Sequence, residues 1–261
     1  MPTLYIANKN YSSWSLRVWV LMRELGIDFD ERLVPFVPAD QTSPFRAFSP
    51  TSRVPCLVEA HSPLGSLGSL DPLGASDSSS LAGAPKNEPG RGLTTIWDSL
   101  AITEYLAEHH PAVWPAQAGA RHWARCASAE MHSGFQTLRQ VCTMNCGVRV
   151  QLATITDGLR SDLERIDTLW CEGLDRFGGP FLAGPAFTAV DAFFCPVAFR
   201  IQSYGLQLSP PAMSYAQRLL ALPSMRSWYE AALTEPWREE GHELDMRRSG
   251  VVQQDLRRSP R

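Results

Sequence analysis

Three short polar segments among the first hundred residues carry the side chains best suited to chemistry. They are the serine pair Ser12-Ser13, the tripeptide Arg53-Val54-Pro55 and the pair Asp98-Ser99. The serines precede an apolar helical pattern, and a helix N-terminus offers free N–H groups and a dipole that stabilise an anion. Asp98-Ser99 opens a second helical pattern, whose N–H groups suit a carboxylate. The sequence therefore predicts a ligand site near the starts of two helices.

The Val54-Pro55 dipeptide precedes a short apolar strand pattern. Proline has no N–H for a strand ladder, so Pro55 marks the beginning of the strand and leaves the backbone of Val54 for another partner. An X-Pro bond in a tight turn is also a candidate for the cis isomer. A peptide-like ligand could pair with Val54 as a β-strand does. The alternative is an ordinary turn from a loop into a strand.

The other groups also have structural alternatives. Ser12 or Ser15 can simply cap the first helix, Asp98 can cap the second, and Arg53 can be a solvated charge at the sheet edge. No serine lies in a G-x-S-x-G motif, which argues against a triad hydrolase, and no glycine-rich phosphate loop is present.

The elements that must position these groups follow from hydrophobic periodicity. Strand patterns cover 3–7, 29–36, 55–59 and 93–97, and helical patterns cover 16–25 and 100–110. The first helix is apolar on two sides, so we expect it to pack against both a sheet and a second layer. These elements predict an α/β unit over residues 1–112.

The remainder of the chain reads as almost entirely helical. Helices are expected at 120–150, 157–177, 188–204, 215–222 and 224–234, which predicts an all-helical domain over 118–240. The stretch at about 62–92 is rich in Gly, Ser, Pro and Ala and predicts a disordered insertion in a hairpin, or alternatively a lid. The polar, arginine-rich residues 241–261 predict a flexible tail.

Composition excludes several classes of protein. The chain has 261 residues with 24 basic and 27 acidic side chains, so its net charge of −3 favours neither nucleic acid nor membrane as a partner. Neither a signal-peptide pattern nor an apolar run of about 20 residues is present, so the cytoplasm is the expected location. The six cysteines form no C-x-x-C pair and lack a histidine partner, so we expect reduced thiols and no metal site.

Taken together, these segments resemble the cytosolic glutathione transferase family, and in particular its serine-type, zeta-like and related bacterial and fungal members. The resemblance rests on YSSWSLR at 11–17, SPTSRVPCL at 49–57, WDSLAITEYL at 97–106, FLAG at 181–184 and the Thr188-x-x-Asp191 pair. It implies an α/β, thioredoxin-like N-terminal domain followed by an all-helical C-terminal domain. It also implies glutathione as co-substrate, no metal, and a homodimer.

The resemblance assigns roles to the glutathione-binding segments. Val54, before a cis Pro55, would pair its backbone with the cysteinyl part of glutathione. Asp98 and Ser99 would hold the γ-glutamyl end, and Arg53 could meet the glycyl carboxylate. Two departures from the family pattern are Ser49, where an asparagine usually precedes the proline, and the insertion at about 62–92.

A serine hydroxyl would face the sulfur of glutathione. Alignment on Arg17 favours Ser12, with Ser13 as the alternative because the loop length is not fixed. A thiol with a pKa of about 8.5 is mostly protonated at neutral pH, and the thiolate is the nucleophile. Serine is too weak a base to remove that proton, so its expected role is to donate a hydrogen bond to the sulfur anion.

The second substrate is expected to be a small apolar electrophile bound between the domains. Phe135, Leu138, Arg139 and Met144 are candidates for its pocket, although such a stripe is commonly core. The Thr188-x-x-Asp191 pair is expected to be a structural capping box.

Three functions compete for this sequence. The leading hypothesis is an enzyme that conjugates glutathione to electrophiles. A glutathione-dependent isomerase of maleylacetoacetate type is the second, although Trp14 stands where its S-S-C-S-W motif has cysteine. The third is a glutathione-transferase-like binding or scaffold protein without turnover.

Overall fold

A four-stranded sheet forms the first part of the structure, a computed structural model that describes residues 1–38, 40–60 and 92–259. Its strands are β1 (Thr3–Ile6), β2 (Asp30–Leu33), β3 (Cys56–Ala60) and β4 (Leu93–Trp97), in the spatial order β2-β1-β3-β4. Strand β1 runs parallel to β2, and β3 runs antiparallel to both β1 and β4. The predicted insertion at about 62–92 lies, apart from its last residue, outside the described residues.

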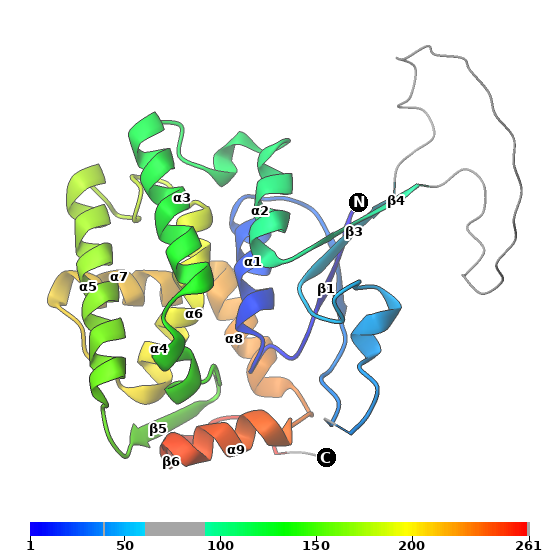
Figure 1. Ribbon diagram of the computed structural model, residues 1–261, viewed down its shortest axis with the longest axis vertical. Coiled ribbons are helices and arrows are strands. Elements are labelled where there is room, and N and C mark those ends of the chain that lie inside the picture. The colour runs from blue at the N-terminus through cyan, green and yellow to red at the C-terminus, as the bar shows by residue number, and fades with distance from the viewer. Residues whose placement is uncertain (39, 61–91, 260–261) are drawn as a thin grey trace, which may run out of the picture.

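Helix α1 (Ser13–Glu24) lies between this sheet and the rest of the chain, beside α2 (Ser99–Ala107) (Figure 1). It contacts β1 on one side and the later helices α6 and α8 on the other. Burial on both sides fits its apolar residues, which are Leu16, Val18, Trp19, Val20, Leu21 and Met22. The prediction of a helix packed between two layers is confirmed, and α1 holds the preceding loop rigidly against both.

The remainder is largely helical (Figure 1). Its helices are α3 (Ala118–Ser133), α4 (Gln136–Val141), α5 (Asp157–Phe177), α6 (Ala189–Tyr204), α7 (Pro210–Ala221), α8 (Pro223–Thr234) and α9 (Glu240–Ser249). No helix within residues 1–38, 40–60 and 92–259 is both long enough and apolar enough to cross a membrane. The mixed sheet and the helical remainder confirm the predicted fold class.

Helix α6 is the centre of the helical part, and the predicted capping box at its start is confirmed. The backbone N–H of Thr188 donates to Oδ2 of Asp191 at 2.9 Å. The fully buried Asp191 carboxylate also accepts from the N–H of Leu182 and from the hydroxyl of Tyr215. Burial raises the pKa of Asp191 to about 6, while these hydrogen bonds oppose the rise. The box therefore ties α6 to the segment before it and to α7.

The prediction of one helix over 120–150 is wrong. Helix α3 ends at Ser133, and Phe135 adopts a left-handed backbone with φ of 58° before α4 begins. A Cβ at Gly134 would lie 2.8 Å from the carbonyl oxygen of Glu130, so the chain can turn there only with glycine. After α4 the chain forms strand β5 (Val148–Leu152). Apolar residues on the two sides of the break therefore face in different directions.

The prediction of a flexible tail over 241–261 is also wrong for the described residues to 259. Helix α9 is followed by strand β6 (Gly250–Asp255), which pairs antiparallel with β5. Figure 1 shows α9 and both strands at one end of the molecule. A buried ion pair between Glu243 and Arg257 fastens this segment. Arg257, one of the arginines on which the prediction of a flexible tail rested, thus pairs with α9 and also donates a hydrogen bond to Tyr11.

Candidate functional site

The loop between β1 and α1 places Ser12 at the N-terminus of the helix. Ser12 makes no side-chain capping bond. Instead its hydroxyl donates to Oγ of Ser15 at 2.7 Å, and Ser15 Oγ also accepts the N–H of Ala7 at 3.3 Å. Both serines are buried. The capping alternative does not describe Ser12, whose hydroxyl belongs to a short chain of hydrogen bonds beginning at the end of β1.

A carboxylate from the far end of the chain fixes this loop, and no sequence pattern indicated it. Glu235 accepts hydrogen bonds from the backbone N–H groups of Lys9 and Asn10 at 2.5 and 3.2 Å. The indole of Trp228 donates to the carbonyl of Lys9 at 2.8 Å. Burial raises the pKa of Glu235, and the hydrogen bonds from the loop oppose that rise. The position of Ser12 thus depends on residues more than 200 positions away.

The Val54-Pro55 bond is cis, as anticipated for this turn. Strand β3 begins one residue later, at Cys56. Within the described parts of the chain, the structure gives no hydrogen-bond partner to the N–H or carbonyl of Val54. The hydroxyl of Ser49, a departure from the family pattern, accepts the N–H of Arg53 at 3.3 Å and so stabilises the same turn. The backbone of Val54 remains available to a ligand.

Asp98 caps α2 and also carries a second interaction. Its Oδ1 accepts the N–H of Leu100 at 2.8 Å, so the capping alternative is real. Its Oδ2 lies 3.5 Å from Nε2 of His132, a residue on α3 that sequence reasoning missed. Beside it, the hydroxyl of Ser99 is buried without any hydrogen-bond partner among the described residues. An unpartnered buried hydroxyl next to a half-exposed carboxylate is suited to a ligand that brings both a donor and an acceptor.

Two adjacent cavities bring the predicted residues together. One has a volume of about 530 Å³ and is lined by Ser12 and Ser13; the other, of about 550 Å³, is lined by Pro55, Asp98 and Ser99. Both are also lined by Trp14, Arg53 and Val54. The predicted glutathione-binding residues therefore surround one continuous stretch of surface, with Val54 between its two ends.

The predicted second-substrate residues are only partly brought together. Arg139 and Met144 line the cavity that contains Ser12. Phe135 and Leu138 do not line it; their exposed fractions are 6% and 0%, and they belong to the hydrophobic core. All four residues follow the break at Gly134, and within this segment Leu138 is on the buried side of α4 while its neighbour Arg139 lines the cavity. Arg200, on α6, also lines this cavity, and the sequence analysis did not single it out.

The ring of Trp14 forms the shared wall of the two cavities. The guanidinium groups of Arg17 and Arg139 lie 4.2 and 4.9 Å from its ring centre, and the ring of His132 packs edge-on at 5.1 Å. Arg17 is buried, and its Nε and Nη1 have no partner among the described residues. Burial, followed by the charges of Arg139 and Arg200, holds the pKa of Arg17 well below its usual value. The site is consequently rich in uncompensated positive charge.

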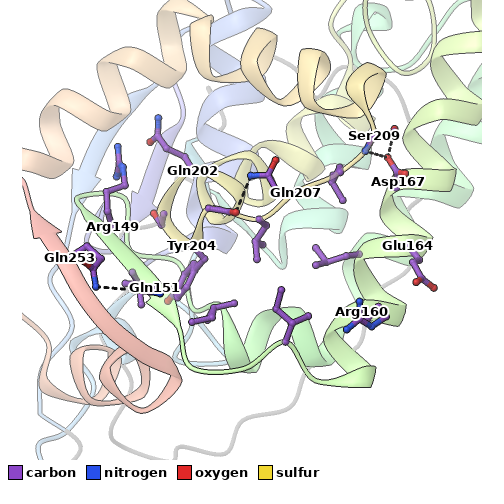
Figure 2. A pocket seen from close by; sticks show the side chains of 18 residues that line it. Arg149, Gln151, Arg160, Glu164, Asp167, Gln202, Tyr204, Gln207, Ser209 and Gln253 are labelled. Carbon is purple, nitrogen blue, oxygen red and sulfur yellow. Dashed lines mark hydrogen bonds between the residues drawn. The ribbon is translucent and has the colours of Figure 1, made fainter.

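A further cavity, with a volume of about 770 Å³, lies elsewhere. Figure 2 shows it between β5, β6, α5 and the end of α6, with Arg149, Arg160, Glu164 and Gln202 among its side chains. It contains none of the predicted site residues. No cluster of three or more His, Cys, Asp or Glu side chains in the described ranges could hold a metal ion.

Comparisons with known proteins point to one family. Residues 11–109 match the family model of the glutathione S-transferase N-terminal domain. A curated relative, "Probable maleylacetoacetate isomerase" from Caenorhabditis elegans, is 24% identical over 231 residues, which cover 84% of this chain and 88% of the relative.

Solved structures share the fold at low sequence identity. A glutathione transferase homologue from Burkholderia, solved with bound glutathione, is 22% identical with a TM-score of 0.56, covering 88% of this chain and 97% of its own. A glutathione S-transferase from Rhodospirillum rubrum is 20% identical with a TM-score of 0.59, covering 90% of this chain and 93% of its own.

Proposed function

We propose that the chain is a member of the glutathione S-transferase family, whose N-terminal domain model matches residues 11–109, and that it binds glutathione and stabilises the thiolate for attack on a small electrophile. The observation that carries this proposal is the placement of Ser12 and Asp98-Ser99 in two cavities joined at Val54. A tripeptide thiol presents, in order, an α-amino acid end, a backbone in the middle with the thiol, and a carboxylate. The two cavities offer groups of matching chemistry: Asp98 and Ser99 in one, Ser12 in the other, and Arg53 and Val54 in both.

The γ-glutamyl end is assigned to Asp98 and Ser99. The Oδ2 atom of Asp98 would receive the ammonium group, and the unpartnered hydroxyl of Ser99 would bond the carboxylate, as would the first N–H groups of α2. The backbone of Val54 would pair with the cysteinyl residue, and Arg53 would meet the glycyl carboxylate. The cis turn and the Ser49 bond hold these backbone groups in place.

Ser12 is assigned to the sulfur, with Ser13 as the alternative. A hydroxyl can rotate, so Ser15 can donate to Ser12 while Ser12 donates to the sulfur; the N–H of Ala7 already fixes Ser15. This arrangement, together with the N-terminus of α1, favours the thiolate and lowers the pKa of the thiol. The thiol proton leaves to water. The sulfur electron pair then forms a C–S bond, and the leaving group departs with its own electron pair.

Replacement of Asp98 by asparagine is expected to raise the KM for glutathione about tenfold, because it removes the charge facing the ammonium group; this is about 1.4 kcal/mol. Asparagine is also a good N-cap, so α2 should remain intact. Steady-state kinetics at varied glutathione measure the effect. Glu104→Gln is the matched control, since Glu104 lies half-exposed on the same helix and its ion pair among the described residues is with Arg125 at 3.4 Å. Equal KM values for the two variants would remove Asp98 from the site.

A glutathione-dependent isomerase is the second candidate, favoured by the relative from Caenorhabditis elegans. Isomerisation would use the same thiolate, which adds to a conjugated double bond and is then expelled after rotation. The two activities are separated by following glutathione itself: conjugation consumes it, and isomerisation returns it. Retention on immobilised glutathione without either activity would instead favour a binding or scaffold role.

The proposal includes a homodimer, as the family resemblance implies. Analytical ultracentrifugation of the full chain would test it.

A further inference from the structure

The cavity beside Ser12 has a positively charged helical wall. Arg139 on α4 and Arg200 on α6 both line it, opposite Arg53 on the sheet side. One carboxylate, that of Asp245, also lines this cavity; its side chain is 54% exposed and pairs with Arg248 at 3.4 Å. Among the described residues, neither Arg139 nor Arg200 takes part in an ion pair. The wall therefore holds two guanidinium groups without a directly bound counter-ion in the described part of the chain.

Backbone carbonyl groups orient both guanidinium groups. Nε of Arg200 donates to the carbonyl of Cys142 at 2.8 Å, and its Nη1 donates to that of Pro196 at 3.3 Å. Nε of Arg139 donates to the carbonyl of Gly134 at 2.9 Å, and its Nη2 donates to those of Met131 and His132. Each guanidinium keeps one nitrogen, Nη2 of Arg200 and Nη1 of Arg139, for which the described chain provides no acceptor. Carbonyl groups fix direction but bring no net negative charge.

Burial makes these unpaired charges costly. Arg200 is buried, and burial lowers its pKa; burial and the nearby charge of Arg200 lower the pKa of Arg139 to about 10. The groups around Arg200 do not compensate, because burial raises the pKa values of Tyr204 and Cys142 to about 12 and keeps both neutral. Near Arg139 the charge of Asp162 opposes the fall in pKa, but Asp162 accepts the N–H of Leu138 and forms no ion pair with Arg139. A bound anionic ligand would balance the positive charges of Arg139 and Arg200.

We propose that the electrophile carries a carboxylate or a similar anionic group, which Arg139 and Arg200 bind while the electrophilic carbon lies toward Ser12. The inference rests on the proposed function. Trp14 provides a flat apolar face next to Arg139, and Met144 lines the same cavity, so the body of the substrate is apolar. Guanidinium groups recognise carboxylates through paired, charge-assisted hydrogen bonds. This assignment replaces a wholly apolar electrophile with an amphipathic, negatively charged one.

The test compares two unreactive probes of nearly the same shape, 3,5-dinitrobenzoate and 3,5-dinitrobenzamide. Their binding to the full chain is measured by calorimetry at neutral pH, with and without saturating glutathione. The native protein should bind the benzoate at least about tenfold more tightly, a typical gain for a charge-assisted pair. In Arg200→Gln and Arg139→Gln the ratio should fall to within about twofold. Arg160→Gln is the control. Arg160 lines the separate cavity of about 770 Å³, so its loss should leave the ratio unchanged.

Equal binding of the two probes by the native protein overturns the inference, and needs no variant that might lose its fold. A preference that survives unchanged in both Arg200→Gln and Arg139→Gln also overturns it, since the anion then binds elsewhere. Circular dichroism identifies a variant that has unfolded, in which case Arg200→Lys, which keeps the charge but not the paired donors, replaces it and should reduce the ratio. Because the probes do not react, these results are independent of whether glutathione is transferred.

Discussion

Replacement of Ser12 by alanine is expected to lower kcat/KM for conjugation about 30-fold at pH 6.5. A hydrogen bond to a charged acceptor contributes about 2 kcal/mol, which corresponds to this factor and to a rise of about 1.5 in the pKa of the bound thiol. The deficit should shrink as the pH rises above about 9, because the thiolate then forms without the serine. The measurement is a pH profile of initial rates with a chlorodinitrobenzene-type electrophile at fixed glutathione.

Two neighbouring serines serve as comparisons for Ser12. Ser13→Ala should change the rate less than about threefold, because Ser13 begins α1 and, within the described structure, its hydroxyl does not take part in the Ser12–Ser15 hydrogen bond. Ser15→Ala should have an intermediate effect, since it removes the group that orients Ser12. A larger loss in Ser13→Ala than in Ser12→Ala would exchange the roles of the two serines.

The second large effect concerns the C-terminal segment. Arg257→Met is expected to cost about 3–5 kcal/mol of local stability, because it removes the buried countercharge of Glu243 and leaves only the exposed Arg247, at 3.8 Å, as a charged partner among the described residues. Arg257 and Glu243 have side chains only 3% and 7% exposed and make two hydrogen bonds to each other. Amide hydrogen exchange in β5 and β6 measures the loss directly, and limited proteolysis should cut the chain after α9.

Matched variants isolate this ion pair. Arg248→Met removes an exposed arginine of α9 and should change stability by less than about 0.5 kcal/mol. The double variant Arg257→Met/Glu243→Gln should recover at least half of the loss, because glutamine is neutral and can still accept from Tyr11 and Asn145. If the double variant were as unstable as Arg257→Met alone, the cost would come from packing and not from an unpaired charge.

The same pair predicts a dependence on pH. Burial alone would raise the pKa of Glu243, but the hydrogen bonds and charge of Arg257 outweigh burial and hold this pKa below its usual value. A carboxylate with a lowered pKa in the folded state stabilises it above the usual value of about 4.3, and this stability is lost as the pH falls further. The difference between the native chain and Arg257→Met should therefore shrink in acid.

The sequence predicted the parts of the site that depend on local chemistry. Pro55 removes a donor and begins a strand, Asp98 and the serines occupy helix starts, and these effects operate over a few residues. The strand and helix positions of the first part followed from the same local periodicity. The roles of Ser12, Val54 and Asp98 in binding glutathione remain predictions.

What the sequence could not predict depends on distant partners or on a single break. Glu235 and Trp228 fix the loop before Ser12 from more than 200 residues away, and nothing in their neighbours indicates this. Arg257 was predicted to be a solvated charge in a flexible tail, because its partner Glu243 lies on α9, 14 residues earlier in the chain. The break at Gly134 was not predicted, and Phe135 directly after it belongs to the core. Arg200 lines the cavity from α6, and no motif in the sequence singled it out.

The central claim is that a serine hydroxyl stabilises the thiolate of bound glutathione, and the pKa of that thiol tests it most directly. The ultraviolet absorbance of the thiolate is titrated for glutathione bound to the native chain, to Ser12→Ala and to Ser13→Ala. The account predicts a pKa below the free thiol's value of about 8.5 in the native chain and in Ser13→Ala, and a return toward that value in Ser12→Ala. An unchanged pKa in both variants would contradict the serine-based mechanism.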